Sequence, residues 1–189
     1  AETHDARTAS LGEGLSFIYE RDFDENGVLY FLGTGEKESV GQSRREWVNP
    51  AETGVVSVTM MTPPAFSGNK NGAISHTKQR LRSKARRNAW VALDLGPLRK
   101  LVTSHYTIRH GGLANEAPLR NWELQGSNDG ETWETMRVHV NDESLKGDYA
   151  TASWPIESII AYRHFRVFDI TASAVQLSVG GLEFYGCLH

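Results

Sequence analysis

The sequence contains almost no cysteine. Of its 189 residues only Cys187 is a cysteine, so the chain cannot form an internal disulfide. Exported β-domains of this size often carry such bonds, and the deficit therefore favours a reducing intracellular compartment, cytoplasmic or nuclear. We interpret Cys187 as a half-buried structural thiol in the last strand.

Long apolar runs are missing as well. No run approaches the ~20 residues that a membrane-spanning helix needs, and no stretch sustains the period of an amphipathic helix. The formal net charge of −3 gives the chain no overall attraction for nucleic acid or acidic membranes. The chain begins at Ala1 without a methionine or a secretory signal, so we expect an excised fragment or a processed product.

The motifs of common enzyme classes are also absent. The seven histidines are scattered without the HExxH spacing of a zinc site. The sequence has no GxSxG elbow, no P-loop and no GxGxxG after a strand. We therefore assign no catalytic residue, and we expect a domain that is not an enzyme and needs no cofactor.

What the sequence does contain is a well-specified β-hairpin at residues 119–138, LRNWELQGSNDGETWETMRV. Residues 122–127 alternate between apolar and polar, the period of a half-buried strand. The sequence Asn128-Asp129-Gly130 then provides turn chemistry. After the turn we expect the apolar residues to face the core, namely Met136, Val138 and Val140.

Similar short alternations recur along the chain and predict eight to ten strands with loops of very unequal length. The expected strands are residues 15–20, 28–32, 55–61, 90–95, 104–109, 122–127, 135–140, 149–154, 163–168 and 176–185. This pattern predicts an all-β, jelly-roll β-sandwich formed by one domain, residues 15–189, after a flexible leader at residues 1–14. We expect four tryptophans to fill its inner faces, namely Trp90, Trp122, Trp133 and Trp154.

Three segments together carry a family resemblance. They are WVALDLGPLRKL (90–101), LRNWELQGSNDGETWETM (119–136), and YRHFRVF with LSVGGLEFYGC (162–168 and 177–187). In this order and spacing they resemble the discoidin or coagulation-factor type C domain, a galactose-binding-like jelly roll. The segments YERDFDENGVLYFLGT (19–34) and WVNP (47–50) are similar to the intracellular members, found in giant HECT-type E3 ubiquitin ligases and some BTB-domain proteins.

The resemblance implies a non-catalytic recognition module whose ligands are sugars, lipids, peptides or proteins, held by loops at one end. Extracellular members tie a cysteine near the first strand to the terminal YGC, and here Cys187 has no such partner. The function that we expect is capture of a substrate or subunit for ubiquitin ligation. Two alternatives stay open: a carbohydrate-binding module that uses the loop end, and a phosphate or nucleic-acid binder.

The candidate ligand-binding residues bracket the loop before the hairpin. They are Arg109, His110, Asn115 and Arg120, with Trp47 as the tryptophan that could face a ligand. Arg109 could offer a bidentate fork to a carboxylate. An equally weighted alternative is that Arg109 and Arg120 brace the rim of the sandwich, pairing with Glu123 or Asp94.

The clearest charge feature is the basic run Lys78, Arg80, Arg82, Lys84, Arg86 and Arg87, inside a long insertion, residues 63–87. Such a loop could bind an acidic peptide, a phosphate or nucleic acid. Aromatic residues for base stacking are not interleaved with it, which disfavours nucleic acid. Most charge runs are simply solvated, and a short helix at residues 77–86 is a further reading of this segment.

An acidic turn offers the one candidate metal site. Asp22, Asp24, Glu25 and Asn26 present clustered oxygens of the kind that calcium prefers. The turn lacks the glycine and terminal glutamate of an EF-hand loop, so a solvated turn is the favoured interpretation and structural calcium the alternative.

Overall fold

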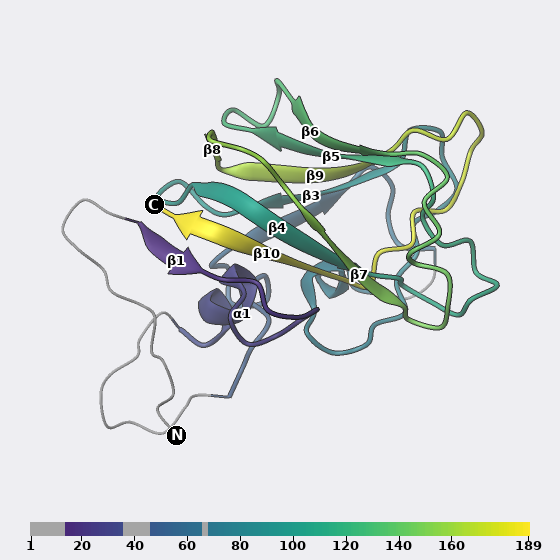
Figure 1. The fold of residues 1–189 in the computed structure, drawn as a ribbon. Coiled ribbons are helices and arrows are strands. Elements are labelled where there is room, and N and C mark those ends of the chain that lie inside the picture. Colours follow the sequence, from purple (N-terminus) through teal and green to yellow (C-terminus); the bar gives the residue numbers. More distant parts are fainter. Residues whose placement is uncertain (1–13, 36–45, 66–67) are drawn as a thin grey trace.

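The computed structural model describes residues 14–35, 46–65 and 68–189, and there the chain forms a two-layer β-sandwich (Figure 1). Its strands are β1 (Leu15–Phe17), β2 (Ser57–Met60), β3 (Trp90–Asp94), β4 (Leu101–Arg109), β5 (Trp122–Ser127), β6 (Glu134–His139), β7 (Thr151–Pro155), β8 (Ala161–Tyr162), β9 (His164–Asp169) and β10 (Gly181–Leu188). The predicted all-β jelly roll is confirmed. The predicted leader, residues 1–14, lies outside the described residues except for Gly14.

The two sheets are antiparallel and five-stranded. Sheet A has the order β1-β10-β4-β7, with β8 paired to β4, and sheet B has the order β2-β3-β9-β5-β6. Cys187 lies on β10 as a free, half-buried thiol, in agreement with the prediction. Short strands joined by long loops leave most of the irregular chain at the ends of the sandwich, where Figure 1 shows it.

Aromatic side chains from both sheets fill the core. Phe165 of sheet B packs on Phe184 of sheet A with ring centroids 4.8 Å apart. Trp122 is fully buried, and its indole N–H donates to the Tyr106 hydroxyl at 3.1 Å. That hydroxyl lies 2.6 Å from His139 Nε2, so the polar tips of the buried rings satisfy one another.

Residues 28–32, predicted as a strand, are part of a helix, α1 (Val28–Gly33). Buried Glu183 of β10 explains the difference, because its carboxylate accepts the N–H groups of Leu29 (2.7 Å) and Tyr30 (2.9 Å) in the first helical turn. Tertiary contact therefore overrides a local β preference. Neither α1 nor the 3-10 helix η1 (Lys70–Ile74), the helices of the described part, is long and apolar enough to cross a membrane.

The β5–β6 hairpin forms as predicted, but one face of β6 is inverted. The turn holds Gly130 at φ +76°, as the sequence indicated. The pairing then shifts register between Leu124 and Gln125, and this bulge changes which residues of β6 face inward. His139 is consequently buried, whereas Val138 and Val140, expected in the core, are 52% and 66% exposed.

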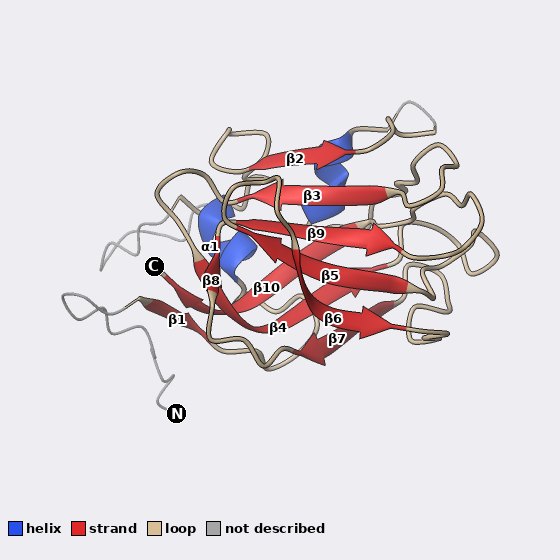
Figure 2. Ribbon diagram, turned by 90° about the horizontal axis from the view of Figure 1, so that it is seen from above, coloured by secondary structure: helices blue, strands red, loops and turns tan. Residues whose placement is uncertain are grey.

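The outer faces of the two sheets differ in their cover. Helix α1 packs on β10 of sheet A, and η1 packs on β10 and β2. No helix of the described chain lies over β3, β9 and β5 of sheet B (Figure 2). In the described structure, the outer face of sheet B therefore has no helical cover over these three strands.

Candidate functional site

Loops that are distant in the sequence meet at the end of the sandwich on the right of Figure 1. Leu81 N–H donates to Gly111 O at 3.0 Å, which joins the insertion to the loop before the hairpin. A Cβ on Gly111 would overlap Leu81 O, and one on Gly180 would overlap Gln79 O, so both positions require glycine. We call residues 75–82, 110–118 and 143–149 the loop rim.

Arg109 and His110 lie beneath the loop rim with little exposure. Arg109 is 7% exposed, and its guanidinium donates to Ser75 O (3.3 Å) and Thr77 O (3.1 Å) and stacks 4.0 Å from the Phe23 ring. Burial lowers the pKa of Arg109. Fully buried His110 donates from Nε2 to Leu113 O (2.9 Å). Both residues hold rim segments in place, and direct ligand contact by either stays a prediction.

Asn115 and Arg120 are exposed on the outside of the rim. Arg120 pairs with Glu143 at 2.9 Å, rather than with Glu123 or Asp94. Glu116 of loop 110–118 pairs with two residues of the basic run, Arg80 and, at 3.1 Å, Arg82. The Leu113 N–H and the Arg80 guanidinium hold the pKa of Glu116 below its usual range.

The basic run is extended, and the helix considered for residues 77–86 does not form. We call its six cations the basic strip: Lys78, Arg80, Arg82, Lys84, Arg86 and Arg87. Backbone hydrogen bonds fix this segment, including Ser83 N–H to Leu177 O (2.9 Å) and Arg86 N–H to Val175 O (3.0 Å). Leu81 and Ser83 face inward, and Arg80, Lys84 and Arg86 alternate with them as exposed residues. The Arg82 side chain is only 12% exposed, and exposed Arg87 follows directly after Arg86.

The two halves of the basic strip differ in their pairing. Arg80 and Arg82 share the single carboxylate of Glu116, which offsets one of their two positive charges. Lys84, Arg86 and Arg87 are exposed, and in the described part of the chain they form no ion pair. The strip therefore presents three available cations on a backbone that is already ordered.

Trp47 lies beside α1, at the His76 end of the loop rim. Its ring packs 5.4 Å from His76, which also contacts Phe23 and Tyr30. The indole N–H is buried without a hydrogen-bond partner among the described residues. The structure therefore does not bring Trp47 together with Asn115 and Arg120.

The acidic turn is closed by its own hydrogen bonds. Asp24 is buried and accepts the N–H groups of Glu20, Arg21 and Asn26 at 2.9–3.0 Å. Asp22 accepts the Ser153 hydroxyl at 2.6 Å. Within the described residues no three His, Cys, Asp or Glu side chains form a group that could hold a metal ion, so calcium binding here stays untested.

A second recessed surface lies on the outer face of sheet B. We call it the outer-face hollow, a depression of about 260 Å³. It is lined by Ser57, Thr59, Trp90, Ala92, Leu93, Asp94, Gly130, Trp133, His164 and Arg166. Small Ala92 forms its floor, and the bulkier residues around it form its walls.

Arg166 is the central charged group of the hollow. Its guanidinium carbon lies 4.2 Å from the Trp133 ring centre and 5.9 Å from that of Trp90. Nε–H donates to Gln125 at 2.8 Å. The two Nη atoms make no hydrogen bond in the described structure and are not buried, so they are open to solvent.

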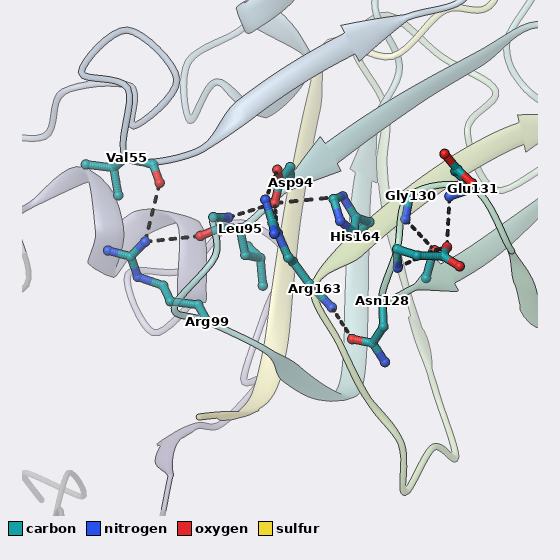
Figure 3. A network of polar contacts seen from close by, with 12 residues as sticks. Val55, Asp94, Leu95, Arg99, Asn128, Gly130, Glu131, Arg163 and His164 are labelled. Carbon is teal, nitrogen blue, oxygen red and sulfur yellow. Dashed lines mark hydrogen bonds and ion pairs between the residues drawn. The ribbon is translucent and has the colours of Figure 1, made fainter.

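The end of the hollow is fixed by a polar network (Figure 3). Arg163 makes a bidentate pair with Asp94, with both N–O distances at 2.7 Å. This pairing holds the pKa of Asp94 below its usual range, while burial lowers the pKa of neighbouring His164. Asn128, from the hairpin turn, accepts Arg163 N–H at 3.3 Å and so joins the turn to β9.

The sequence reasoning missed this surface because it placed Trp90 and Trp133 in the core. Both are only half-buried, and Trp90 pairs with Phe168 on the outer face of sheet B. The alternation of apolar and polar residues in β9 was the sequence pattern that indicated this surface. Phe165, Val167 and Asp169 are the buried residues there, so His164, Arg166 and Phe168 had to face outward together.

No known family model matches the chain. It is 36% identical over 191 residues to the E3 ubiquitin-protein ligase Ufd4 of Drosophila melanogaster, covering 95% of this chain and 6% of that protein. It is 31% identical to the ligase hecd-1 of Caenorhabditis elegans, covering 93% and 7%. A BTB/POZ domain-containing protein of Arabidopsis thaliana is 32% identical, covering 89% and 22%.

Among solved structures, the family 32 CBM of Clostridium perfringens NanJ in complex with galactose matches with a TM-score of 0.56 at 13% identity, covering 70% of this chain and 94% of that one. A Streptococcus pneumoniae fucose binding module matches with a TM-score of 0.55 at 18% identity, covering 68% and 89%. The chain is a discoidin-type, galactose-binding-like domain. The discoidin-type domain thus shares its fold with these modules and its sequence with segments of the two ligases and the BTB protein.

The discoidin-type domain corresponds to a small part of its curated relatives. It spans 6% and 7% of the two ligases and 22% of the BTB protein. A match to so small a part does not assign the activities of those whole proteins to this domain.

Proposed function

We propose that the discoidin-type domain is a non-catalytic protein-recognition module that recruits a substrate or a subunit to a HECT-type ubiquitin ligase inside the cell, in the cytoplasm or nucleus. Its sequence relatives, the ligases Ufd4 and hecd-1, support the ligase context. The observation that carries recognition is the set of unpaired cations Lys84, Arg86 and Arg87 on a segment fixed by backbone hydrogen bonds.

An acidic segment of a protein is the partner that this surface favours. Ordered backbone keeps the entropic cost of binding low, because only the three side chains must be immobilised. Complementary charge would steer the partner and set its register along the strip. Asn115 and Arg120 extend the contact at the rim, and Arg109 and His110 contribute by holding the rim beneath them.

A carbohydrate ligand is the second candidate function. The structural neighbours crystallised with galactose and described as fucose-binding support it. At the loop rim the described aromatic ring is that of Tyr149, and Lys78 Nζ lies 5.9 Å from its centre. A sugar would have to displace Lys78 to stack there, which makes the protein partner the better-supported ligand.

A cross-linking experiment tests the proposal. A photoreactive residue replaces exposed Ala85, between Lys84 and Arg86, and the 189-residue chain is incubated with cell lysate. We expect cross-links to an acidic protein segment, lost in K84E/R86E/R87E. The matched control R21E/K70E/K100E makes the same charge change at exposed basic residues outside the loop rim and the basic strip, and it keeps the cross-links. Cross-links to nucleic acid, release by galactose, or equal loss in both triple variants would overturn the proposal.

A further inference from the structure

We infer that the outer-face hollow is a second binding site, separate from the loop rim, for an extended peptide segment in which a carboxylate side chain adjoins an aliphatic one. The inference does not rest on the proposed function of the loop rim. It stands on three features of the described structure: the open guanidinium of Arg166, the aromatic walls, and the neutralised carboxylate of Asp94.

The carboxylate preference comes from Arg166. Its Nε is occupied by Gln125, and its two Nη atoms remain open to solvent. A guanidinium stacked on Trp133 is held in one orientation, so its remaining donors are already positioned to bind a carboxylate. Glu123 acts on Arg166 through its charge, but no hydrogen bond joins the two in the described structure, and Glu123 Oε2 accepts from Gln125 (2.7 Å) and Thr135 (2.8 Å).

Asp94, whose carboxylate lines the hollow, does not repel an anionic ligand strongly. Asp94 is paired with Arg163 through two bonds of 2.7 Å, and Gly96 N–H adds a third at 2.8 Å. His164 Nδ1 lies 3.7 Å from the same carboxylate. Asp94 therefore shapes the end of the hollow as part of a neutral pair.

The aliphatic preference comes from the floor and the walls. Ala92 lies directly opposite Arg166 in the β3–β9 pairing and opposite Thr59 in the β2–β3 pairing. Its side chain is small, and the hollow that it lines with Trp90, Trp133 and Arg166 has a volume of about 260 Å³, enough for an aliphatic group beside the guanidinium. The four-residue step from Trp90 to Asp94 is about 13 Å along a strand, the length of a short extended peptide.

A pair of peptides tests the inference by NMR titration. The probes are acetyl-Leu-Glu-Leu-amide and acetyl-Leu-Gln-Leu-amide, which differ in one carboxylate. We expect the Glu peptide to shift the indole N–H signals of Trp90 and Trp133 and to bind about tenfold more tightly than the Gln peptide. The indole of Trp122, buried against Tyr106, is the internal control and does not shift.

Two variants and one negative control complete the test. Ala92→Leu fills the hollow, and Arg166→Gln removes the guanidinium. We expect each variant to abolish the indole shifts. If Ala92→Leu does not fold, Arg166→Gln alone provides the test. K84E/R86E/R87E leaves the shifts unchanged, which separates this site from the basic strip. Equal affinity for the two peptides, no shift at millimolar peptide, the same indole shifts with galactose, or binding retained in both hollow variants would overturn the inference.

Discussion

The loop rim and the outer-face hollow use arginine in opposite ways. At the rim, Arg109 is buried against backbone carbonyls, and Arg80 and Arg82 are paired with Glu116. In the hollow, Arg166 is stacked on Trp133 with two nitrogens open to solvent. The role of an arginine in this domain therefore depends on which of its hydrogen bonds are made within the protein.

The two regions also distinguish residues that stabilise the fold from residues that can bind a partner. Groups whose hydrogen bonds are satisfied inside the protein stabilise it, whereas groups that are hydrated can bind a partner in exchange for water, without breaking a bond within the protein. By this criterion Arg109 and His110 make their hydrogen bonds within the protein, whereas Lys84, Arg86, Arg87 and the Nη atoms of Arg166 are open to a partner.

The largest expected effect compares Arg109 with Arg166. Arg109→Met removes the donors to the buried Ser75 carbonyl and the part-buried Thr77 carbonyl, and it should destabilise the domain by about 2 kcal/mol. Arg166→Met should cost less than about 1 kcal/mol, because its open nitrogens contribute nothing to the fold. Urea unfolding of both variants measures this difference. Equal destabilisation would show that the two arginines do not differ in role.

A smaller effect concerns the pair that shapes the end of the hollow. Arg163 holds the pKa of Asp94 below its unfolded value of about 3.9. The pair therefore stabilises the fold above that pH, and this contribution is lost as the pH falls through the folded-state pKa. Asp94→Asn should cost about 0.5–1 kcal/mol at pH 7 and flatten the acid dependence of stability.

Thermal unfolding of wild type and Asp94→Asn between pH 7 and 2 checks this, with Glu143→Gln as a control. Glu143 pairs with Arg120 on the exposed rim, so its removal should change stability much less. An acid dependence as steep in Asp94→Asn as in wild type would contradict the assignment.

The smallest stability effect is expected at the loop rim itself. Glu116→Gln should change stability by about 0.5 kcal/mol or less, since Arg80 is largely exposed. It releases Arg80 and Arg82, so it should raise the affinity for an acidic partner severalfold, by extending the available half of the basic strip. Binding measured at two salt concentrations checks this. Unchanged affinity would mean that the partner does not reach Arg80.

The sheet architecture could be predicted because alternation and turn residues are local signals. The turn at Asn128-Asp129-Gly130 is the clearest case, since Asp129 accepts the N–H groups of Glu131 and Thr132 as such turns do. Helix α1 could not be predicted, because Glu183, a partner 154 residues from Leu29, decides it.

The candidate site was predicted in part. Loop 110–118 and the basic run were chosen separately, and the structure joins them through Leu81 and Gly111. The bulge that turns His139 inward, and the outward placement of Trp90, depend on register, which a single strand does not reveal. The burial of Arg109 depends on a segment more than thirty residues away that folds over it.

One binding measurement tests most directly whether the basic strip recognises an acidic protein segment. The segment cross-linked through position 85 is made as a peptide, and its affinity is measured for wild type and for the two triple variants. We expect at least about a tenfold loss for K84E/R86E/R87E and little change for R21E/K70E/K100E. Equal affinities in the two variants would contradict it.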